Sequence, residues 1–236
     1  MRSPLEGSRE WLLLDEVEST QQVAVIALKD NAPSGVVFAK HQTKGTGRFG
    51  RAWFSEEGDS LTMTLILRSY PNHPKPYLLG MAVAAAAAGV VHCRLQWPND
   101  LTIRGRKLGG ILTELYPDEE ARLVALVGVG INLNQKEFPA DIAHRATSLH
   151  LEHGKQYDPL EVARQIVERI ESLPEPNAWS DLAPVWSLYD RTPGKKYRLP
   201  DGQEATAIAV GSSGELLCSI NGESHSLLAA DAVFGN

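Results

Sequence analysis

Cysteine is scarce in this 236-residue sequence, which contains only Cys93 and Cys218. The two lie far apart and form no Cys-x-x-Cys pair, so the sequence predicts neither a disulfide framework nor a cysteine-based zinc site. The histidines at His150 and His153 have no third ligand nearby in the sequence, and we therefore predict no metal site built from the chain alone. This cysteine usage favours a reducing, cytoplasmic compartment.

Long apolar runs are also missing. The stretch most like one, Leu78 to Val91, is short and rich in alanine, whereas a bilayer span needs roughly 20 strongly apolar residues. It therefore predicts a buried helix. The first ten residues carry Arg, Ser, Pro and Glu without an apolar core, so they do not resemble a signal peptide. We expect no membrane association.

The chain has no surplus of positive charge. Lysine and arginine number 23 against 29 acidic residues, for a formal net charge of −6, which argues against a general nucleic-acid binder. A local basic cluster nevertheless stands out in this acidic background, and it suits a small anionic ligand. Its members are Arg48, Arg51, Arg104, Arg106 and Lys107.

What is present is a mixture of helical and strand patterns. With 43% apolar residues, the chain can bury one sizeable core and still form a small appended domain. Ser19 and Gln22 form a capping-box pattern that predicts a helix start, and Asp158-Pro159 predicts another. Strands are predicted at 36–42, 60–68, 94–97, 101–103, 109–115 and 123–132, and helices at 23–28, 78–91, from 158 and at 178–189.

From about Arg191 the sequence pattern changes from a mixture of helices and strands to short strands alone. Four short β-like segments are separated by Asp201-Gly202, Ser213-Gly214 and Asn221-Gly222. Asp-Gly and Asn-Gly between apolar runs are strong hairpin signals. The sequence therefore predicts a small β-barrel over 191–236, appended to a mixed α/β domain over 1–190.

The sharpest local motif runs from Lys44 to Arg51, directly after a predicted strand. Its glycines spell Gly-x-Gly-x-x-Gly, which raises the possibility of a dinucleotide-binding fold. That fold needs a helix at the glycines and an acidic residue about 20 positions later. The residues that follow, 52–55, are a poor helix start, and no Asp or Glu occurs between Asp59 and Asp100. Both features argue against a dinucleotide-binding fold.

A second use of the same loop fits better. Glycines let backbone N–H groups approach an anion closely, and Arg48 and Arg51 add guanidinium groups suited to phosphate. The loop is thus predicted to close over a phosphate-bearing ligand. The alternative is a plain β-turn with surface arginines.

Two further motifs point to a ligand. Lys107 lies beside Gly109-Gly110 among aliphatic residues, where a lysine is costly unless a negative group meets it, and paired glycines in a strand suggest a close approach. Residues 127–134 alternate with glycine, which leaves one strand face bare for a flat ligand or for tight packing against a helix. Asn132, at the end of that strand, offers both a donor and an acceptor.

These motifs together resemble those of the biotin–protein ligases, also called biotin–[acetyl-CoA-carboxylase] ligases, and the match is collinear over nearly the whole chain. The matching pieces are Glu18-Ser19-Thr20-Gln21, Gln42 to Arg51 with Trp53-Phe54-Ser55, Trp97 to Leu101, Lys107 to Leu112, and Gly128 to Asn132. The resemblance implies an α+β fold with a mixed β-sheet flanked by helices, the biotin/lipoate ligase-like catalytic domain, and a small C-terminal SH3-like β-barrel.

The resemblance also implies roles for residues. Ser19, Thr20 and Gln21 would line a biotin pocket, and Gln42 would hold the ureido end. The loop that closes over biotin and the adenylate would comprise Gly45, Thr46, Gly47, Arg48 and Arg51, with Trp53 packing beside it. Lys107 would contact the biotin carboxylate and the phosphate, Gly110 and Ile111 would flank the ligand, and Asn132 would meet the adenine.

The implied activity is ATP-dependent ligation of biotin to a carrier protein through biotinyl-5′-AMP. Lys107, Arg48 and Asp100 are the predicted catalytic groups, where Asp100 assists the acceptor lysine, binds Mg²⁺ or only caps a turn. ATP and biotin are the predicted substrates, with Mg²⁺. The partner would be the biotin carboxyl carrier domain of acetyl-CoA carboxylase or of another carboxylase, and a homodimer is compatible with the resemblance.

Two departures and two alternatives accompany this prediction. The tail reads Ala230-Asp231-Ala232-Val233 where the family often has a Gly-Glu-Val turn, so we expect the last strand of the barrel to differ. The family loop usually reads Gly-Arg-Gly-Arg, and Thr46 stands in place of the first arginine, so one loop cation is missing. Some members carry an N-terminal winged helix, whereas only about fifteen residues precede the ligase motifs here; we expect an enzyme without DNA binding. The alternatives are a lipoate or octanoate transferase of the same superfamily and a non-catalytic biotin sensor.

Overall fold

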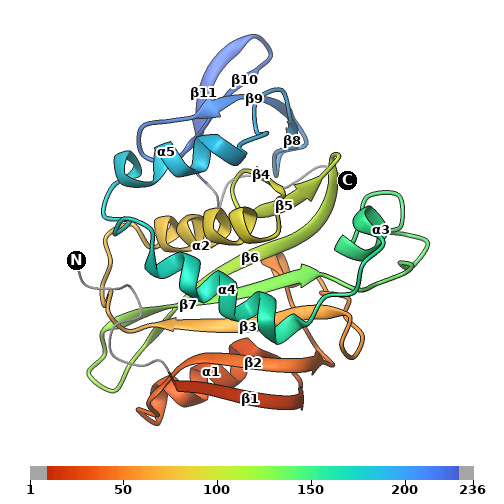
Figure 1. Cartoon of the computed structure of the whole chain (residues 1–236). Helices are drawn as coiled ribbons and strands as arrows, with labels where there is room; N and C mark the ends of the chain where they lie inside the picture. The colour runs from red at the N-terminus through yellow and green to blue at the C-terminus, as the bar shows by residue number, and fades with distance from the viewer. Residues whose placement is uncertain (1–9, 229–236) are drawn as a thin grey trace.

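The computed structural model describes residues 10–228, and a seven-stranded sheet runs through their centre (Figure 1). The strand order is β1-β2-β3-β7-β6-β5-β4. The β1–β2 pair is parallel and the other neighbours are antiparallel, so the sheet is mixed. The strands are β1 (Glu10–Val17), β2 (Ser34–Gln42), β3 (Ser60–Leu67), β4 (Arg94–Gln96), β5 (Asp100–Ile103), β6 (Arg106–Pro117) and β7 (Leu123–Asn132).

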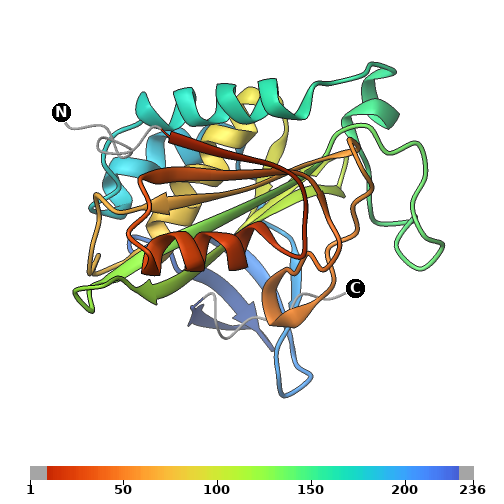
Figure 2. The same cartoon turned by 90° about the horizontal axis from the view of Figure 1, so that it is seen from below.

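Helices cover both faces of this sheet. Helices α2 (Pro76–Val90) and α4 (Pro159–Glu171) pack against one face, and α1 (Thr20–Lys29) packs against the other. Figure 2 shows α4 and α1 on opposite sides of the strands. Helix α5 (Trp179–Tyr189) lies on α2, and the short α3 (Leu149–His153) follows the loop after β7.

The alternation of residues along β7 shows how the two faces differ. Val127, Val129 and Ile131 are buried in the main core with α2 and α4. Val124 and Leu126 point the other way, into a smaller cluster beneath α1. Because side chains alternate along a strand, the glycines at 128 and 130 lie on the α1 side. The α1 face of β7 is therefore covered by helix α1 near Val124 and Leu126. Near Gly128 and Gly130 the same face has no β7 side chains.

Helix α2 confirms the buried helix predicted from its alanine run. Residues 82–88 are each 5% exposed or less. Alanine favours the helical backbone and its small side chain permits close packing, so the helix can contact β6, α4 and α5 at once. In the described part of the chain, no helix is long and apolar enough to cross a membrane.

A second sheet confirms the predicted change of character near the C-terminus. It contains β8 (Lys196–Arg198), β9 (Glu204–Val210), β10 (Leu216–Ile220) and β11 (Glu223–Leu227), all antiparallel, in the order β11-β10-β9-β8. It lies beyond α2 and α5 at one end of the molecule (Figure 1). The arrangement is consistent with an SH3-like unit, and with the flanked mixed sheet it confirms the predicted fold class.

Three features differ from the sequence-based prediction. First, strand β1 was not predicted: the central sheet already begins at Glu10, within the stretch that we placed before the ligase motifs. β1 is an edge strand beside β2 and half of its residues are exposed, so it lacks a clean apolar alternation. Second, helix α3 was not predicted, because its five residues are too few to show a helical period. Third, the Ser19 hydroxyl caps α1 through the N–H of Gln21, whereas the capping-box pattern predicted the N–H of Gln22.

Candidate functional site

The open part of the α1 face forms a surface of glycines, threonines and one leucine, which we call the floor. The register joins Thr62 to Gly130 and Thr64 to Gly128 across β3 and β7, and it joins Gly110 to Gly130 and Leu112 to Gly128 across β6 and β7. Directly opposed residues point to the same face. The floor therefore comprises Thr62, Thr64, Gly110, Leu112, Gly128 and Gly130.

The N-terminus of α1 meets one end of the floor with uncharged polar groups. The N–H and the hydroxyl of Thr20 donate to Oε1 of Gln42 at 2.7 and 2.9 Å. The hydroxyl of Thr20 also lies 2.9 Å from that of Thr64. The helix start, the end of β2 and the floor are thus joined through one threonine.

Gln21 ties the same helix end to the far side of the floor. Its Nε2 donates to Oε2 of Glu114 at 3.0 Å and to the carbonyl of Leu126 at 3.2 Å. Its Oε1 accepts from the hydroxyl of Thr64 at 3.0 Å. A buried amide whose groups are all engaged has a fixed orientation. This end of the site is consequently rigid and polar. The groups from α1, β2 and β3 are uncharged, and the Glu114 carboxylate is engaged by Gln21.

The glycine-rich loop after β2 folds as a narrow turn. Trp53 N–H donates to Gly45 O at 2.8 Å, and Gly47 N–H donates to Arg51 O at 2.7 Å. The tip is a single 3-10 turn, Arg48–Gly50, in which Phe49 has a φ of +58°. No α-helix opens at these glycines, which agrees with the sequence-based argument against the dinucleotide-binding fold.

The indole of Trp53 packs on Gly130. A Cβ atom at Gly130 would lie 2.8 Å from Cε2 of the indole, so a side chain there would displace the ring. Of the two uses suggested for the alternating glycines, close packing applies at Gly130, although against an aromatic ring rather than a helix. Within residues 10–228 the buried Nε1–H of Trp53 has no hydrogen-bond partner.

Arg48 points from the loop toward the turn between β4 and β5. Its Nη1 lies 3.4 Å from Oδ1 of Asn99, and its Cζ lies 4.9 Å from the centre of the Phe49 ring. Burial lowers the pKa of the guanidinium, Asp100 opposes that shift and Arg51 adds to it. An arginine retains its charge under such shifts, so a partly desolvated cation lies at this end of the floor.

Lys107 and Asp100 lie together above Gly110. Nζ of Lys107 is 2.6 Å from Oδ1 of Asp100 and would be 3.5 Å from a Cβ atom at Gly110. The register explains the position: Leu101 pairs with Gly109 but Thr102 pairs with Lys107, so Leu108 is an extra residue in β6. This bulge brings Lys107 onto the Gly110 face, although residues three apart in a regular strand face opposite sides.

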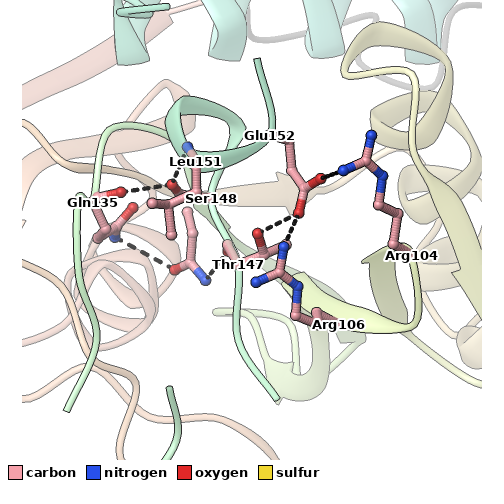
Figure 3. A network of polar contacts seen from close by, with 8 residues as sticks. Arg104, Arg106, Gln135, Thr147, Ser148, Leu151 and Glu152 are labelled. Carbon is pink, nitrogen blue, oxygen red and sulfur yellow. Dashed lines mark hydrogen bonds and ion pairs between the residues drawn. The ribbon is translucent and has the colours of Figure 1, made fainter. Parts of the chain in front are cut away.

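Asn132 is the last residue of β7 and joins a second polar network. Figure 3 shows other members of this network, among them Gln135, Thr147 and Glu152. Nδ2 of Asn132 donates to Thr147 O at 3.0 Å, and its Oδ1 accepts from Gln135 at 3.4 Å. Thr147 in turn donates to Oε1 of Glu152 at 2.6 Å. The Glu152 side chain is 2% exposed and also pairs with Arg106 at 2.6 Å, so the network joins α3 to the β5–β6 hairpin.

The structure brings most of the predicted site residues together around the floor. Ser19, Thr20, Gln21 and Gln42 lie at one end, and Arg48, Asp100 and Lys107 lie at the other. The side chain of Ile111 points away, toward Gly80 of α2, so the prediction for Ile111 can apply only to its backbone. A cavity of about 410 Å³ between α2, β6 and the C-terminal sheet is lined by few of the predicted residues, Arg48 and Ile111 among them.

Three residues of the site were not assigned from the sequence. Asn99 was quoted within a motif without a role, yet its Oδ1 accepts from Arg48 and its Nδ2 donates to Ile111 O. Thr64 had a signal, since threonines alternate with aliphatic residues along β3. Glu114 had none, because its contact with Gln21 spans 93 positions. The described residues contain no group of three potential metal-ligating side chains.

Comparisons with known proteins give a consistent result. A family model described as the biotin/lipoate A/B protein ligase family matches residues 13–132. The biotin–[acetyl-CoA-carboxylase] ligase of Mycobacterium tuberculosis is 30% identical, and the match covers 99% of this chain and 93% of that relative. The bifunctional ligase/repressor BirA of Bacillus spizizenii is 38% identical over 65% of this chain. That match spans 50% of the relative's own length.

A solved structure extends the similarity to three dimensions. The biotin protein ligase from Aquifex aeolicus, in complex with biotin and ATP, matches with a TM-score of 0.71 and 28% sequence identity. The alignment covers 95% of this chain and 98% of that one, so it includes both the central sheet and the C-terminal sheet.

Proposed function

Because the chain belongs to the biotin/lipoate A/B protein ligase family, we propose that it is an ATP-dependent biotin–protein ligase. It joins biotin to ATP as biotinyl-5′-AMP and transfers the biotinyl group to a lysine of a carrier domain. The observation that carries this proposal is the polarity of the floor, with uncharged hydrogen-bonding groups at one end and two cations at the other. Biotin has the matching polarity, with a ureido ring at one end and a carboxylate at the other.

In this proposal the uncharged end of the floor binds the ring system. Gln42 and Thr20 supply an amide and a hydroxyl group for the ureido oxygen and nitrogens. Gln21 lines the pocket, and its fully engaged amide keeps this end in place. Trp53 provides an apolar wall with a buried indole N–H. Ser19 supports the pocket through its cap on α1. The bare backbone of Gly110 leaves room for the ligand, whereas Oε1 of Gln21 already lies over Gly128.

Adenylation brings two anions together, so the charged end must neutralise them. A biotin carboxylate oxygen attacks the α-phosphorus of ATP, and the bond to pyrophosphate breaks. Lys107 has three N–H donors, so its contact with Asp100 is compatible with donation to the carboxylate and to a phosphate oxygen. Arg48 shares the phosphate charge as the loop from Lys44 to Arg51 covers the adenylate and excludes water.

The nucleotide end lies toward Asn132, which meets the adenine in this proposal. Mg²⁺ in nucleotide enzymes is held by one or two carboxylates together with substrate phosphates. Asp100 fits that pattern as the single carboxylate beside Lys107, and the ion would supply further neutralisation of the phosphates. In the second half-reaction the acceptor amine attacks the acyl carbon and the bond to AMP breaks. The alternative role of Asp100 is to take the proton that the amine releases.

The acceptor would be the biotin carboxyl carrier domain of acetyl-CoA carboxylase or of another carboxylase, as the name of the mycobacterial relative suggests. We also propose that residues 1–190 form the catalytic domain and 191–236 a separate small domain. The change from α2, α4 and α5 to four short antiparallel strands supports this boundary. Residues 1–9 and 229–236 of these two units lie outside the described part.

Pyrophosphate release from ATP tests the proposal directly. It would be measured with biotin, with lipoate and with neither, in the presence and absence of a biotin carrier domain. We expect release that depends on biotin and label that moves to the carrier lysine. Activity with lipoate alone would favour an acyl transferase of the same family, and binding of biotin without release would favour a sensor.

A further inference from the structure

The backbone of Trp97 is held by residues that lie around the C-terminal sheet. The N–H of Trp97 donates to Oγ1 of Thr192 at 2.9 Å. Its carbonyl accepts from the hydroxyl of Tyr197 at 2.9 Å. Its indole N–H donates to the carbonyl of Gly214 at 2.9 Å. Three distant points of the sequence thus satisfy the three polar groups of one residue.

This contact is fully buried. Trp97 is 1% exposed and Tyr197 is 0% exposed, and their rings meet edge to face with centres 6.0 Å apart. Burial also raises the pKa of the Tyr197 phenol far above its usual value, which keeps its O–H protonated as a donor. A buried carbonyl that loses such a donor is costly, so the backbone would move to regain a partner.

Trp97 begins the turn that delivers two site groups to the floor. Asn99 lies two residues later, where its Oδ1 accepts from Arg48 and its Nδ2 donates to the carbonyl of Ile111. Asp100 follows and pairs with Lys107. Pro98 stands between the anchor and these groups, and its ring fixes φ. This link therefore has fewer ways to absorb a displacement of Trp97 before it reaches Asn99 and Asp100.

We propose that Tyr197 and Thr192 are positioning residues: from the C-terminal part of the chain they fix the Trp97–Asp100 turn and thereby set Arg48 and Lys107 for adenylation. The inference rests on the proposed function and goes beyond it by giving the C-terminal sheet a task in the chemistry at the floor. It makes a specific kinetic claim. The turn touches the charged end of the floor, whereas the uncharged end is held by Thr20, Gln21 and Gln42.

Replacing Tyr197 with phenylalanine removes only the hydroxyl. We expect Tyr197→Phe to lower kcat for biotin-dependent pyrophosphate release by about tenfold or more, because misplacement of a charged group by about 1 Å can cost up to 10²-fold. The KM for biotin should stay within about twofold of wild type, since the groups proposed for the ureido ring are untouched.

Thr192 supplies an independent variant with a built-in rescue. Thr192→Val keeps the shape of the side chain but loses the oxygen that accepts from Trp97, and it should reproduce the kcat loss. Thr192→Ser keeps that oxygen and should restore most of the activity. Thr192 and Tyr197 are both fully buried in the wild type. The melting temperature of each variant is therefore measured, so that a loss of folding is not mistaken for a loss of positioning.

Tyr77→Phe serves as the matched control. The Tyr77 hydroxyl donates to Ser213 O at 2.7 Å, a bond that joins α2 to the turn before β10 without involving the Trp97 backbone. If only the attachment of the C-terminal sheet to the catalytic domain matters, Tyr77→Phe and Tyr197→Phe will lower kcat equally, and the inference is wrong. We expect Tyr77→Phe to stay near wild type.

A double-mutant cycle with Asn99→Ala completes the test. If Tyr197 acts through the turn, the kcat losses of Tyr197→Phe and Asn99→Ala should be clearly less than additive. Additive losses would overturn the inference while the proposed function stood. Wild-type protein that releases no pyrophosphate with biotin would instead remove the proposed function, and this inference with it.

Discussion

The ammonium of Lys107 and the carboxylate of Asp100 meet at 2.6 Å on the same side of the sheet as Gly110. They do so because of one extra residue in β6, Leu108, which reverses the side on which Lys107 emerges. Without the bulge the lysine would point toward α2, into the main core. A local irregularity of one strand thus places the principal cation of the proposed reaction.

Lys107→Ala should abolish most of the activity while the protein remains folded. We expect both half-reactions to slow by about 10²- to 10³-fold, comparable to the loss of one preorganised donor at an active site. The ion pair is partly exposed, with side-chain exposures of 45% and 15%, so the stability change should be about 1 kcal/mol or less. Pyrophosphate release and label transfer are the measurements.

Lys196→Ala provides a control for the Lys107 variant. It breaks an exposed lysine–glutamate pair of 2.7 Å, with Glu204, in the C-terminal sheet. We expect wild-type turnover. Near-normal turnover of Lys107→Ala, with a normal melting temperature, would refute the role assigned to this lysine.

Arg48→Gly should separate formation of the adenylate from its retention. Lys107 remains to support adenylation, but the loop loses the cation that reaches Asn99. Thr46 already replaces one loop cation of the family pattern, so the loss should be pronounced. We expect biotin label on lysines of a bystander protein, measured against Arg122→Ala, whose guanidinium pairs with Asp118 near the β6–β7 turn. Labelling confined to the carrier lysine would contradict the proposal.

The two adjacent glycines of β6 should respond oppositely to alanine. At Gly109 a Cβ atom would lie 2.5 Å from the carbonyl oxygen of Gly130, so backbone must move. We expect Gly109→Ala to lose about 1 to 3 kcal/mol of stability. At Gly110 the nearest atom, Nζ of Lys107, is 3.5 Å away. Gly110→Ala should keep wild-type stability and lose activity, because its methyl group stands on the floor.

Urea unfolding and pyrophosphate release distinguish these two effects. Both variants add the same methyl group to the same strand, so each is the control for the other. A stable Gly109→Ala would show that β6 and β7 can separate locally. A fully active Gly110→Ala would show that the ligand does not approach this part of the floor.

Much of this site could be predicted because its sequence signals are local. The glycine loop, the hairpin turn at 97–99 directly before Asp100 and the capping serine at Ser19 are each determined by residues next to one another. The lysine among aliphatic residues also predicted a negative partner, and Asp100 is that partner, although the Lys107 side chain is 45% exposed and not buried in the core.

The rest depends on contacts that no local pattern encodes. The bulge at Leu108 depends on which β5 residue pairs with which β6 residue, and the packing of Trp53 on Gly130 joins segments 77 positions apart. Gln21 reaches Glu114 across the sheet. The hydrogen bond between Trp97 and Tyr197 joins residues 100 positions apart. It could be predicted only by someone who knew how the chain runs into the C-terminal sheet.

Cys93 predicts how stability changes at alkaline pH. Burial raises the pKa of its thiol to about 12, from an ordinary value of 9.0. Between these values the unfolded chain releases a proton that the folded chain keeps, so the free energy of unfolding falls as the pH rises. Cys93→Ala lacks this contribution. The stability difference between wild type and variant, measured by urea unfolding, should therefore shrink from about pH 8 to about pH 11; a constant difference would contradict it.

Glu152 should support the nucleotide end of the site without touching a ligand. Its buried carboxylate accepts from Arg106 and Thr147, and Figure 3 shows these groups converging from the β5–β6 hairpin and the loop before α3. Thr147 also holds Asn132, and its N–H donates to the carbonyl of Lys107 at 2.8 Å. Glu152 thus fixes both the proposed adenine contact and the backbone of the principal cation.

Glu152→Gln keeps the size of this side chain and removes its charge. We expect a loss of about 1 to 3 kcal/mol in stability, the range for a hydrogen bond to a charged group. The KM for ATP should rise by up to about 10²-fold through misplacement, whereas biotin binding, measured by calorimetry, should stay within about twofold because Thr20 and Gln42 lie at the other end. Glu204→Gln, which weakens an exposed pair with Lys196, is the control. Equal losses for biotin and ATP would mean that Glu152 maintains only the fold, since a general loosening would not spare one end of the floor.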